Sequence, residues 1–152
     1  MQDEAMGILL ALIERFEGLR LRPYICPAGV PTIGLGSTRY EDGTPVKLTD
    51  PAITRERAYA IARDQLLREY IPQTLALCPG IDTQRRAAAL VDFSYNLGSG
   101  ALRGSTLRKR VNAGRWDDVP GELLKWVRGG GRILPGLVAR RKSEAMLVQR
   151  SI

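Results

Sequence analysis

The chain has 152 residues, 44% of them hydrophobic, a size that allows one sizeable core or two small lobes sharing a helix, but not two independent average domains. It holds no apolar run of about eighteen residues and no basic-then-apolar start, so we expect neither a signal peptide nor a signal anchor. The net charge of +7 is uneven: residues 1–76 carry nine basic and ten acidic side chains and residues 77–152 carry fourteen and six, so the second half favours an anionic partner.

An amphipathic helix is predicted over residues 3–17. Its apolar side chains recur at helical spacing: Met6, Leu9, Leu10, Ile13 and Phe16. Gly18 follows where a left-handed residue usually ends a helix, which makes Glu17 the last helical side chain. The negative end of the helix dipole, and any burial, favour the protonated form of a carboxyl at that position. A carboxyl that keeps its proton is what a general acid requires.

A β-hairpin is predicted after Gly18, with its turn at residues 27–29 and a returning strand at residues 32–36. Residues 37–50 have the composition of a loop, and a third short strand at residues 37–40 stays open. Eight residues separate Glu17 from Cys26, and five separate Cys26 from Thr32. A helix that leads into a hairpin can gather an acid, a thiol and a hydroxyl around one site. Taken singly, the three are more often a surface Glu, a half-buried Cys and a strand Thr.

The remaining chain is predicted to be mostly helical. Thr54 is the expected N-cap of a helix that runs to about residue 70, before Pro72, and Asp82 is the expected N-cap of an enclosed helix that runs to Leu97. Ser105 or Thr106 begins a short helix. Further helices are expected near residues 116–126 and 137–149, and the three glycines at 129–131 between them predict a flexible loop.

Residue types exclude several kinds of site. The chain has no His, so neither a serine-type triad nor the usual metal motifs are present, and Gly34 and Gly36 do not continue into a phosphate loop. We therefore expect no metal and no cofactor. The two cysteines, Cys26 and Cys78, are too few for a disulfide framework and favour synthesis in a reducing compartment. Because the chain has no His, acid–base chemistry must use carboxyl groups, the thiol or water.

The segment from Glu17 to Gly36 resembles the catalytic segment of phage endolysins of glycoside hydrolase family 24, the lysozyme family of the T-even phages. The resemblance rests on the motifs Glu17-Gly18-Leu19 and Thr32-Ile33-Gly34-Leu35-Gly36 and on the spacing of Glu, Cys and Thr. The common family member has Asp where this chain has Cys26, although some family endolysins resemble this chain in carrying Cys there.

The resemblance implies an α+β, mostly α, two-lobed lysozyme-like fold in a single catalytic domain. The small lobe, about residues 17–55, would hold a β-hairpin or a three-stranded sheet. A linking helix would cover about residues 54–71. The helical lobe would comprise about residues 80–152 together with the N-terminal helix, residues 3–17.

The resemblance also implies an endolysin that hydrolyses the β-1,4 bond between N-acetylmuramic acid and N-acetylglucosamine and so lyses the host cell. Glu17 would be the general acid and Thr32 would aim the attacking water. Cys26 has three open roles: thiolate stabiliser, weak base toward water, or nucleophile. A positioned water suggests inversion, which favours the first two. An ordinary thiol is mostly protonated at pH 7, and Arg20 and Arg22 are close enough in sequence to lower its pKa.

Short motifs later in the chain also resemble family segments near the substrate. The substrate-binding residues that they imply are Tyr95, Asn96, Ser105 and Thr106. Structural roles stay open for all four: core packing for Tyr95, the end of its helix for Asn96, and an N-cap for the Ser–Thr pair. The segment Gly136–Glu144 resembles a family segment too. Support of the acid site by Arg140 or Arg141 stays open, and we expect most of the segment's charges to be solvated.

The expected partner is bacterial peptidoglycan, bound by a monomer. The protein would stay in the host cytoplasm until a separate membrane-permeabilising partner, a holin, releases it to the periplasm and cell wall. The basic second half leaves anionic envelope polymers or lipids open as further partners, whereas nucleic acid is not expected because the arginines are scattered and form no recognised motif. The alternative function is a non-catalytic cell-wall or anionic-polymer binding module of the same fold.

Overall fold

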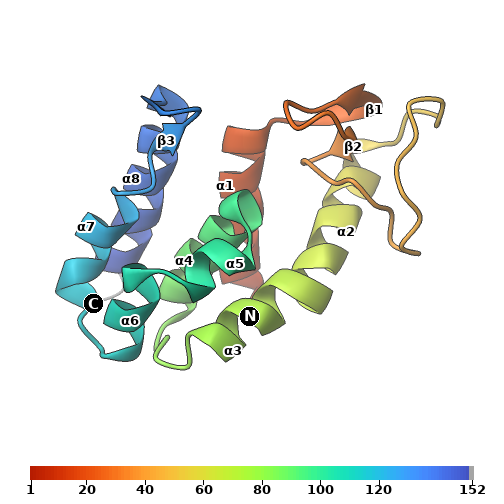
Figure 1. Cartoon of the computed structure of the whole chain (residues 1–152). Coiled ribbons are helices and arrows are strands. Elements are labelled where there is room, and N and C mark those ends of the chain that lie inside the picture. The colour runs from red at the N-terminus through yellow and green to blue at the C-terminus, as the bar shows by residue number, and fades with distance from the viewer. Residues whose placement is uncertain (151–152) are drawn as a thin grey trace. The chain divides into compact units, whose positions relative to one another are not determined.

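The computed structural model describes residues 1–150; the last two residues of the predicted helical lobe lie outside this range. The described chain is mostly helical with two small antiparallel sheets (Figure 1), as the predicted fold class requires. It divides into two compact units, Leu10–Arg68 on the one hand and Met1–Leu9 with the residues from Glu69 onward on the other. Within residues 1–150, no helix combines the length and the apolar character that crossing a bilayer demands.

The small unit, Leu10–Arg68, contains the end of α1 (Asp3–Glu17), the hairpin β1 (Arg20–Ile25) and β2 (Pro31–Gly34), a long loop and α2 (Arg55–Gln65). Helix α1 ends as predicted, with Glu17 last and Gly18 at φ +78°. The strands pair antiparallel. Residues 37–40 add only single bridges instead of a third strand, so the hairpin is the correct alternative.

Strand β2 packs directly against α2. Five buried side chains form the core between them: Ile33, Val46, Ile53, Ala58 and Ile61. A Cβ atom at Gly34, where φ is +69°, would lie 3.3 Å from the Cβ of Ala58. Only a residue without a side chain fits here easily, and the glycine therefore sets how closely the hairpin approaches the helix.

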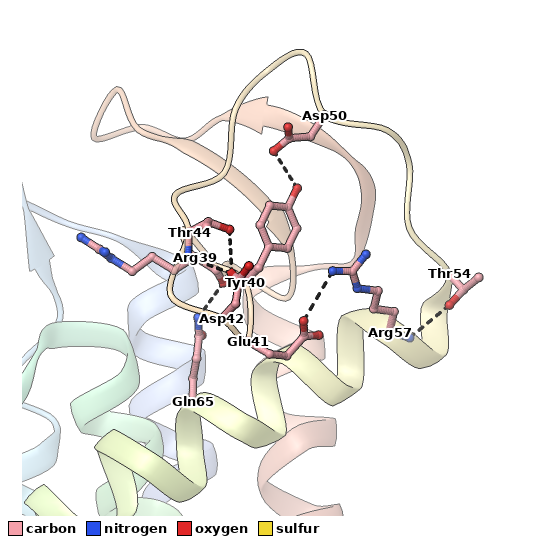
Figure 2. Close-up of polar contacts among 9 residues, drawn as sticks. All are labelled: Arg39, Tyr40, Glu41, Asp42, Thr44, Asp50, Thr54, Arg57 and Gln65. Atoms are coloured by element: carbon pink, nitrogen blue, oxygen red, sulfur yellow. Dashed lines mark hydrogen bonds and ion pairs between the residues drawn. The ribbon is translucent and has the colours of Figure 1, made fainter.

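The loop that joins the hairpin to α2 is held by its own hydrogen bonds (Figure 2). The Tyr40 hydroxyl donates to Asp50 Oδ2 at 2.9 Å, and Gln65 of α2 donates to the Arg39 carbonyl at 2.9 Å. The hydrogen bonds that Asp50 accepts from the Lys47 backbone and from Tyr40 lower the pKa of its carboxyl. Residues 37–54 are thus a loop, as predicted, but an internally bonded one.

Helix α2 runs on through a π-helical turn (Leu66–Tyr70) into α3 (Ile71–Leu77). Pro72 lies in the first turn of α3. Proline lacks an N–H donor and its ring crowds the carbonyl four residues earlier, and the wider π turn just before it relieves both problems. The proline therefore does not end the helical segment near residue 70.

In the larger unit, α4 (Gln84–Leu97) packs against α3, α5 (Ser99–Arg103) and α8 (Pro135–Gln149). Most of the α4 surface is buried, as its small and aliphatic residues predict. Its N-cap is Thr83, whose hydroxyl accepts from the Arg86 N–H at 3.2 Å. The predicted cap, Asp82, instead pairs with the Arg86 guanidinium at 2.8 Å. The other helical elements of this unit are α6 (Thr106–Asn112), a 3-10 turn (Trp116–Asp118) and α7 (Val119–Leu123).

The charges of the segment Gly136–Glu144 are mostly buried, so the expectation that they are solvated was wrong. Arg140 donates to both carboxylate oxygens of Asp92 on α4, at 2.9 and 2.8 Å. Arg141 is fully buried and lies 2.9 Å from the buried carboxylate of Glu144. Burial, followed by the charge of Asp92, raises the pKa of Glu144 well above its ordinary value. These side chains face α4, whose Asp92 supplies the balancing charge.

Residues 128–133 form a second hairpin, with strands β3 (Arg128–Gly129) and β4 (Arg132–Ile133), where a flexible loop was predicted. Its two turn residues, Gly130 and Gly131, both have positive φ, +58° and +79°. A two-residue turn of this hand matches the twist of the strands and suits consecutive glycines. The strands were missed because they are only two residues long.

Candidate active site

Glu17 lies at the end of α1 beside the loop that follows β2. A Cβ atom at Gly36, where φ is +88°, would lie 3.4 Å from Glu17 Oε2 and 3.7 Å from its Cδ. The glycine backbone can therefore approach the carboxyl group without a side chain between them. This brings the chain after β2 against the proposed acid.

The last turn of α1 is anchored to α2 one turn before Glu17. The Arg55 guanidinium donates to Glu14 Oε1 at 2.8 Å and to Oε2 at 3.0 Å, and the Tyr59 hydroxyl also donates to Glu14. Arg55 lies over the Tyr59 ring, 4.9 Å from its centroid. A bidentate pair with a fixed orientation restrains the helix end more than a single contact does.

One face of the first hairpin carries three polar side chains. Tyr24 and Thr32 are directly opposed in the antiparallel ladder, so their side chains point to the same face. Cys26, two residues beyond Tyr24, follows on that face by the alternation of an extended chain. Its turn is closed by hydrogen bonds from the Gly29 N–H to the Cys26 carbonyl, 2.8 Å, and from the Cys26 N–H to the Val30 carbonyl, 3.1 Å.

The thiol of Cys26 lies in a setting that favours the thiolate. Hydrogen bonds from the backbone of Val30, and then from the side chain of Thr32, lower its pKa below the ordinary 9.0. Arg20 and Arg22, which are near in sequence, are not among the causes. Arg20 lies instead over the ring of Tyr24, 4.7 Å from its centroid.

Thr32 is almost wholly buried, with 2% of its surface exposed. Its hydroxyl donates to the Val30 carbonyl at 2.8 Å. A hydroxyl has one proton, so it serves either this carbonyl or the sulfur of Cys26 at a given moment. The contacts of Thr32 thus lie within the hairpin and involve the thiol.

Tyr24 is influenced by the charges of both the acid and the thiol. Burial is the main cause that raises the pKa of Tyr24, and the charges of Glu17 and Cys26 raise it further, while Arg20 opposes them. Thr32 is its cross-strand partner. Sequence reasoning assigned no role to Tyr24. Strand alternation, which pairs it with Cys26, was the available signal.

Tyr95 and Asn96, at the end of α4, lie in the larger unit. The ring of Tyr95 is 5.0 Å from that of Tyr70, with the planes inclined by 56°. The Asn96 side-chain oxygen accepts from Arg141 Nη2 at 2.7 Å. Both side chains are half-buried. The amide of Asn96 is therefore tied to the buried charges of α8 through its oxygen.

Ser105 and Thr106 begin α6 and differ in exposure. Ser105 is the N-cap: its hydroxyl accepts from the Arg108 N–H at 3.0 Å and donates to the Leu102 carbonyl at 2.7 Å. With 4% of its surface exposed, Ser105 fills the structural role left open for it. Thr106 is exposed and is the member of the pair that can reach a ligand.

A family model described as phage lysozyme matches residues 14–144, which include Glu17, Cys26 and Thr32. The chain belongs to the phage lysozyme family. This lysozyme-family chain is 37% identical over 148 residues to an endolysin of Acyrthosiphon pisum secondary endosymbiont phage 1, covering 92% of this chain and 94% of that protein. It is also 38% identical over 141 residues to an endolysin of Bacillus phage B103, covering 90% of this chain but only 50% of that longer protein.

A solved structure supports the same assignment. The endolysin from Escherichia coli O157:H7 phage FAHEc1 superposes with a TM-score of 0.79 and 35% sequence identity, covering 100% of this chain and 96% of that chain. The lysozyme-like fold expected from the Glu17–Gly36 segment is thereby confirmed.

The lowered pKa of Cys26 predicts its reactivity. Because alkylation uses the thiolate, the rate of iodoacetamide labelling at Cys26 should rise with pH and reach half its maximum below pH 9.0. Cys78 is the internal control, since it is fully buried and burial raises its pKa to about 11. Site-resolved mass spectrometry across a pH series measures both. Equal half-maxima at the two cysteines would contradict the hydrogen-bonded thiolate setting.

Proposed function

We propose that this chain is an endolysin that hydrolyses the β-1,4 bond between N-acetylmuramic acid and N-acetylglucosamine in peptidoglycan. The observation that carries the proposal is that one unit of a chain of the phage lysozyme family holds Glu17 at the end of α1 and Cys26 and Thr32 on the adjoining hairpin. The endolysin names of its relatives support the same reading. The substrate is the glycan of the bacterial wall, and its cleavage lyses the host.

Glu17 is proposed as the general acid. Cleavage through an oxocarbenium-like state requires a proton on the leaving oxygen and negative charge near the sugar ring. Its position at the end of α1, with the Gly36 backbone beside it, supports this role because the carboxyl group is held by helix and loop together. The proton passes from the carboxyl to the glycosidic oxygen as the C–O bond breaks.

Cys26 is proposed to replace the family's Asp as a thiolate that stabilises positive charge on the sugar or as a weak base toward water. Its lowered pKa supports the anionic form, and its hydrogen bonds are to Val30 and Thr32 rather than to a cation. Water then attacks, the anomeric carbon inverts, and the water's second proton leaves to the thiolate or to solvent. Thr32, whose hydroxyl donates to the Val30 carbonyl within the hairpin, is proposed to aim this water.

On the larger unit we propose Tyr95 and Thr106 as sugar contacts, Asn96 as a contact through its NH₂ group, and Ser105 as the cap that places Thr106. The chain acts as a monomer without metal or cofactor, and a holin releases it from the host cytoplasm. The non-catalytic wall-binding module is less favoured, because a binding surface alone does not require an acid, a thiol and a hydroxyl on one hairpin and helix end.

Replacing the acid tests the function. Glu17→Gln should reduce the clearing of a cell-wall suspension about 10²- to 10⁴-fold, because the amide has no proton to give. Glu56→Gln, an exposed glutamate of α2, is the matched control and should keep full activity. Mass analysis of digested murein should find new reducing muramic ends. Full clearing of the suspension by Glu17→Gln would contradict the proposal, and anhydro muramic ends would indicate a lyase.

Replacing the thiol tests the role of Cys26. Cys26→Ser should cost about 10²-fold through loss of the charge. Cys26→Asp should remain active, since a carboxyl with a pKa of about 3.9 is anionic at neutral pH. If Cys26→Ser keeps full activity, the thiol has no essential part.

The close approach of Gly36 to the acid gives a matched pair of glycine variants. Gly36→Ala and Gly43→Ala both place a side chain at positive φ, +88° and +85°, and each should lower the free energy of unfolding by about 1 to 2 kcal/mol. Only the Cβ at position 36 meets Glu17; at position 43 nothing lies within 4 Å. Wall-clearing rates should therefore fall in Gly36→Ala alone. Equal rates in the two folded variants would show that the contact is not needed.

A further inference from the structure

The β3–β4 hairpin exposes apolar side chains next to unpaired arginines. Ile133 is 57% exposed and Leu134, the residue after β4, is 40% exposed. Arg128 and Arg132 are exposed, and neither forms an ion pair with any other residue in the range 1–150. In Figure 1 the hairpin lies at the start of α8, within the same unit. Solvent-facing apolar groups on a short hairpin give the fold itself no evident benefit.

The hairpin holds these side chains in a defined arrangement. Arg128 and Ile133 are directly opposed in the ladder and so share one face, which lets the arginine stem lie along the isoleucine. The Leu134 N–H donates to the Val127 carbonyl at 2.9 Å and extends the pairing. A Cβ atom at Gly129 would lie 2.5 Å from Leu134 Cδ1, so the leucine is fitted closely against the glycine.

The charge around the hairpin has one sign. Between Glu122 and Glu144 the chain holds six basic residues and no acidic one. Two are the buried Arg140 and Arg141, and Lys125 pairs with Glu122, which leaves Arg128, Arg132 and Lys142 facing solvent. An anionic polymer would satisfy these cations but leave Ile133 and Leu134 in water. A bilayer with anionic headgroups offers phosphate to the arginines and hydrocarbon to the apolar side chains.

We propose that the β3–β4 hairpin docks on membranes that contain anionic phospholipids. Ile133 and Leu134 enter the boundary between headgroups and acyl chains, and Arg128 and Arg132 reach back to the phosphates. This surface belongs to the larger unit, shares no residue with the proposed catalytic set and adds an interaction to the proposed hydrolysis. It would hold the protein at the inner membrane, against the wall it degrades.

The apolar contribution is tested with the whole chain and vesicles. The wild type should sediment with mixed phosphatidylglycerol–phosphatidylcholine vesicles and not with pure phosphatidylcholine. Ile133→Ser should weaken the partition coefficient about threefold to tenfold. Leu48→Ser removes a similarly exposed side chain, 54% against 57%, from the other unit and should leave binding unchanged. Unchanged melting temperatures show that both variants fold. Equal binding by the two variants would overturn the proposal.

The charge contribution separates lipid from other polyanions. Replacing Arg128 and Arg132 by Ala should weaken vesicle binding by about fivefold for each arginine. The control replaces two exposed cations elsewhere in the unit, Arg103 and Lys109, and should have a smaller effect. Polyphosphate is the second probe. If polyphosphate binds as tightly as vesicles and Ile133→Ser changes neither, the surface is a polyanion site and the lipid assignment fails. Hydrolysis of lipid-free murein should be unaffected throughout.

Discussion

The close packing of strand β2 and the residues that follow it is the constraint on which the candidate site depends. Gly34 lets the strand approach Ala58 of α2, and Gly36 lets the chain approach the carboxyl of Glu17 at the end of α1. Two glycines that are separated by one residue thus allow the hairpin to pack against α2 and the following chain to lie beside the end of α1. A side chain at Gly34 would crowd Ala58, one at Gly36 would contact Glu17, and both positions have the positive φ that favours glycine.

The same unit contains side chains that restrain the end of α1 and the loop after the hairpin but are not themselves candidate site residues. Arg55 and Tyr59 fix Glu14, one turn before Glu17, and the loop after the hairpin is closed by the hydrogen bonds of Asp50 and Gln65. A general acid must keep its direction to within a small angle to be effective, and such restraint comes from neighbours that make no contact with substrate. The site is therefore a property of the whole small unit.

The helix end at Glu17 and the first hairpin could be predicted because local signals decide them: apolar spacing, a glycine at the helix end and turn residues between alternating strands. The burial of Arg140 could not, because it depends on Asp92, which is 48 residues away in the chain. Thr83 and Asp82 are both good N-cap residues. In the structure Thr83 accepts the backbone N–H of Arg86, and Asp82 pairs with the Arg86 guanidinium instead. The cause of the lowered pKa of Cys26 could not be chosen from sequence proximity to Arg20 and Arg22, because the fold supplies hydrogen bonds from Val30 and Thr32 instead.

The half-exposed thiol of Cys26 gives the first hairpin a chemistry that a carboxyl group at that position would not have. Thiolates bind soft metal ions such as Cu⁺, whereas carboxylates prefer hard ones such as Mg²⁺ and Ca²⁺. The sulfur is therefore open to copper ions in the medium, a sensitivity that the backbone fold alone does not reveal.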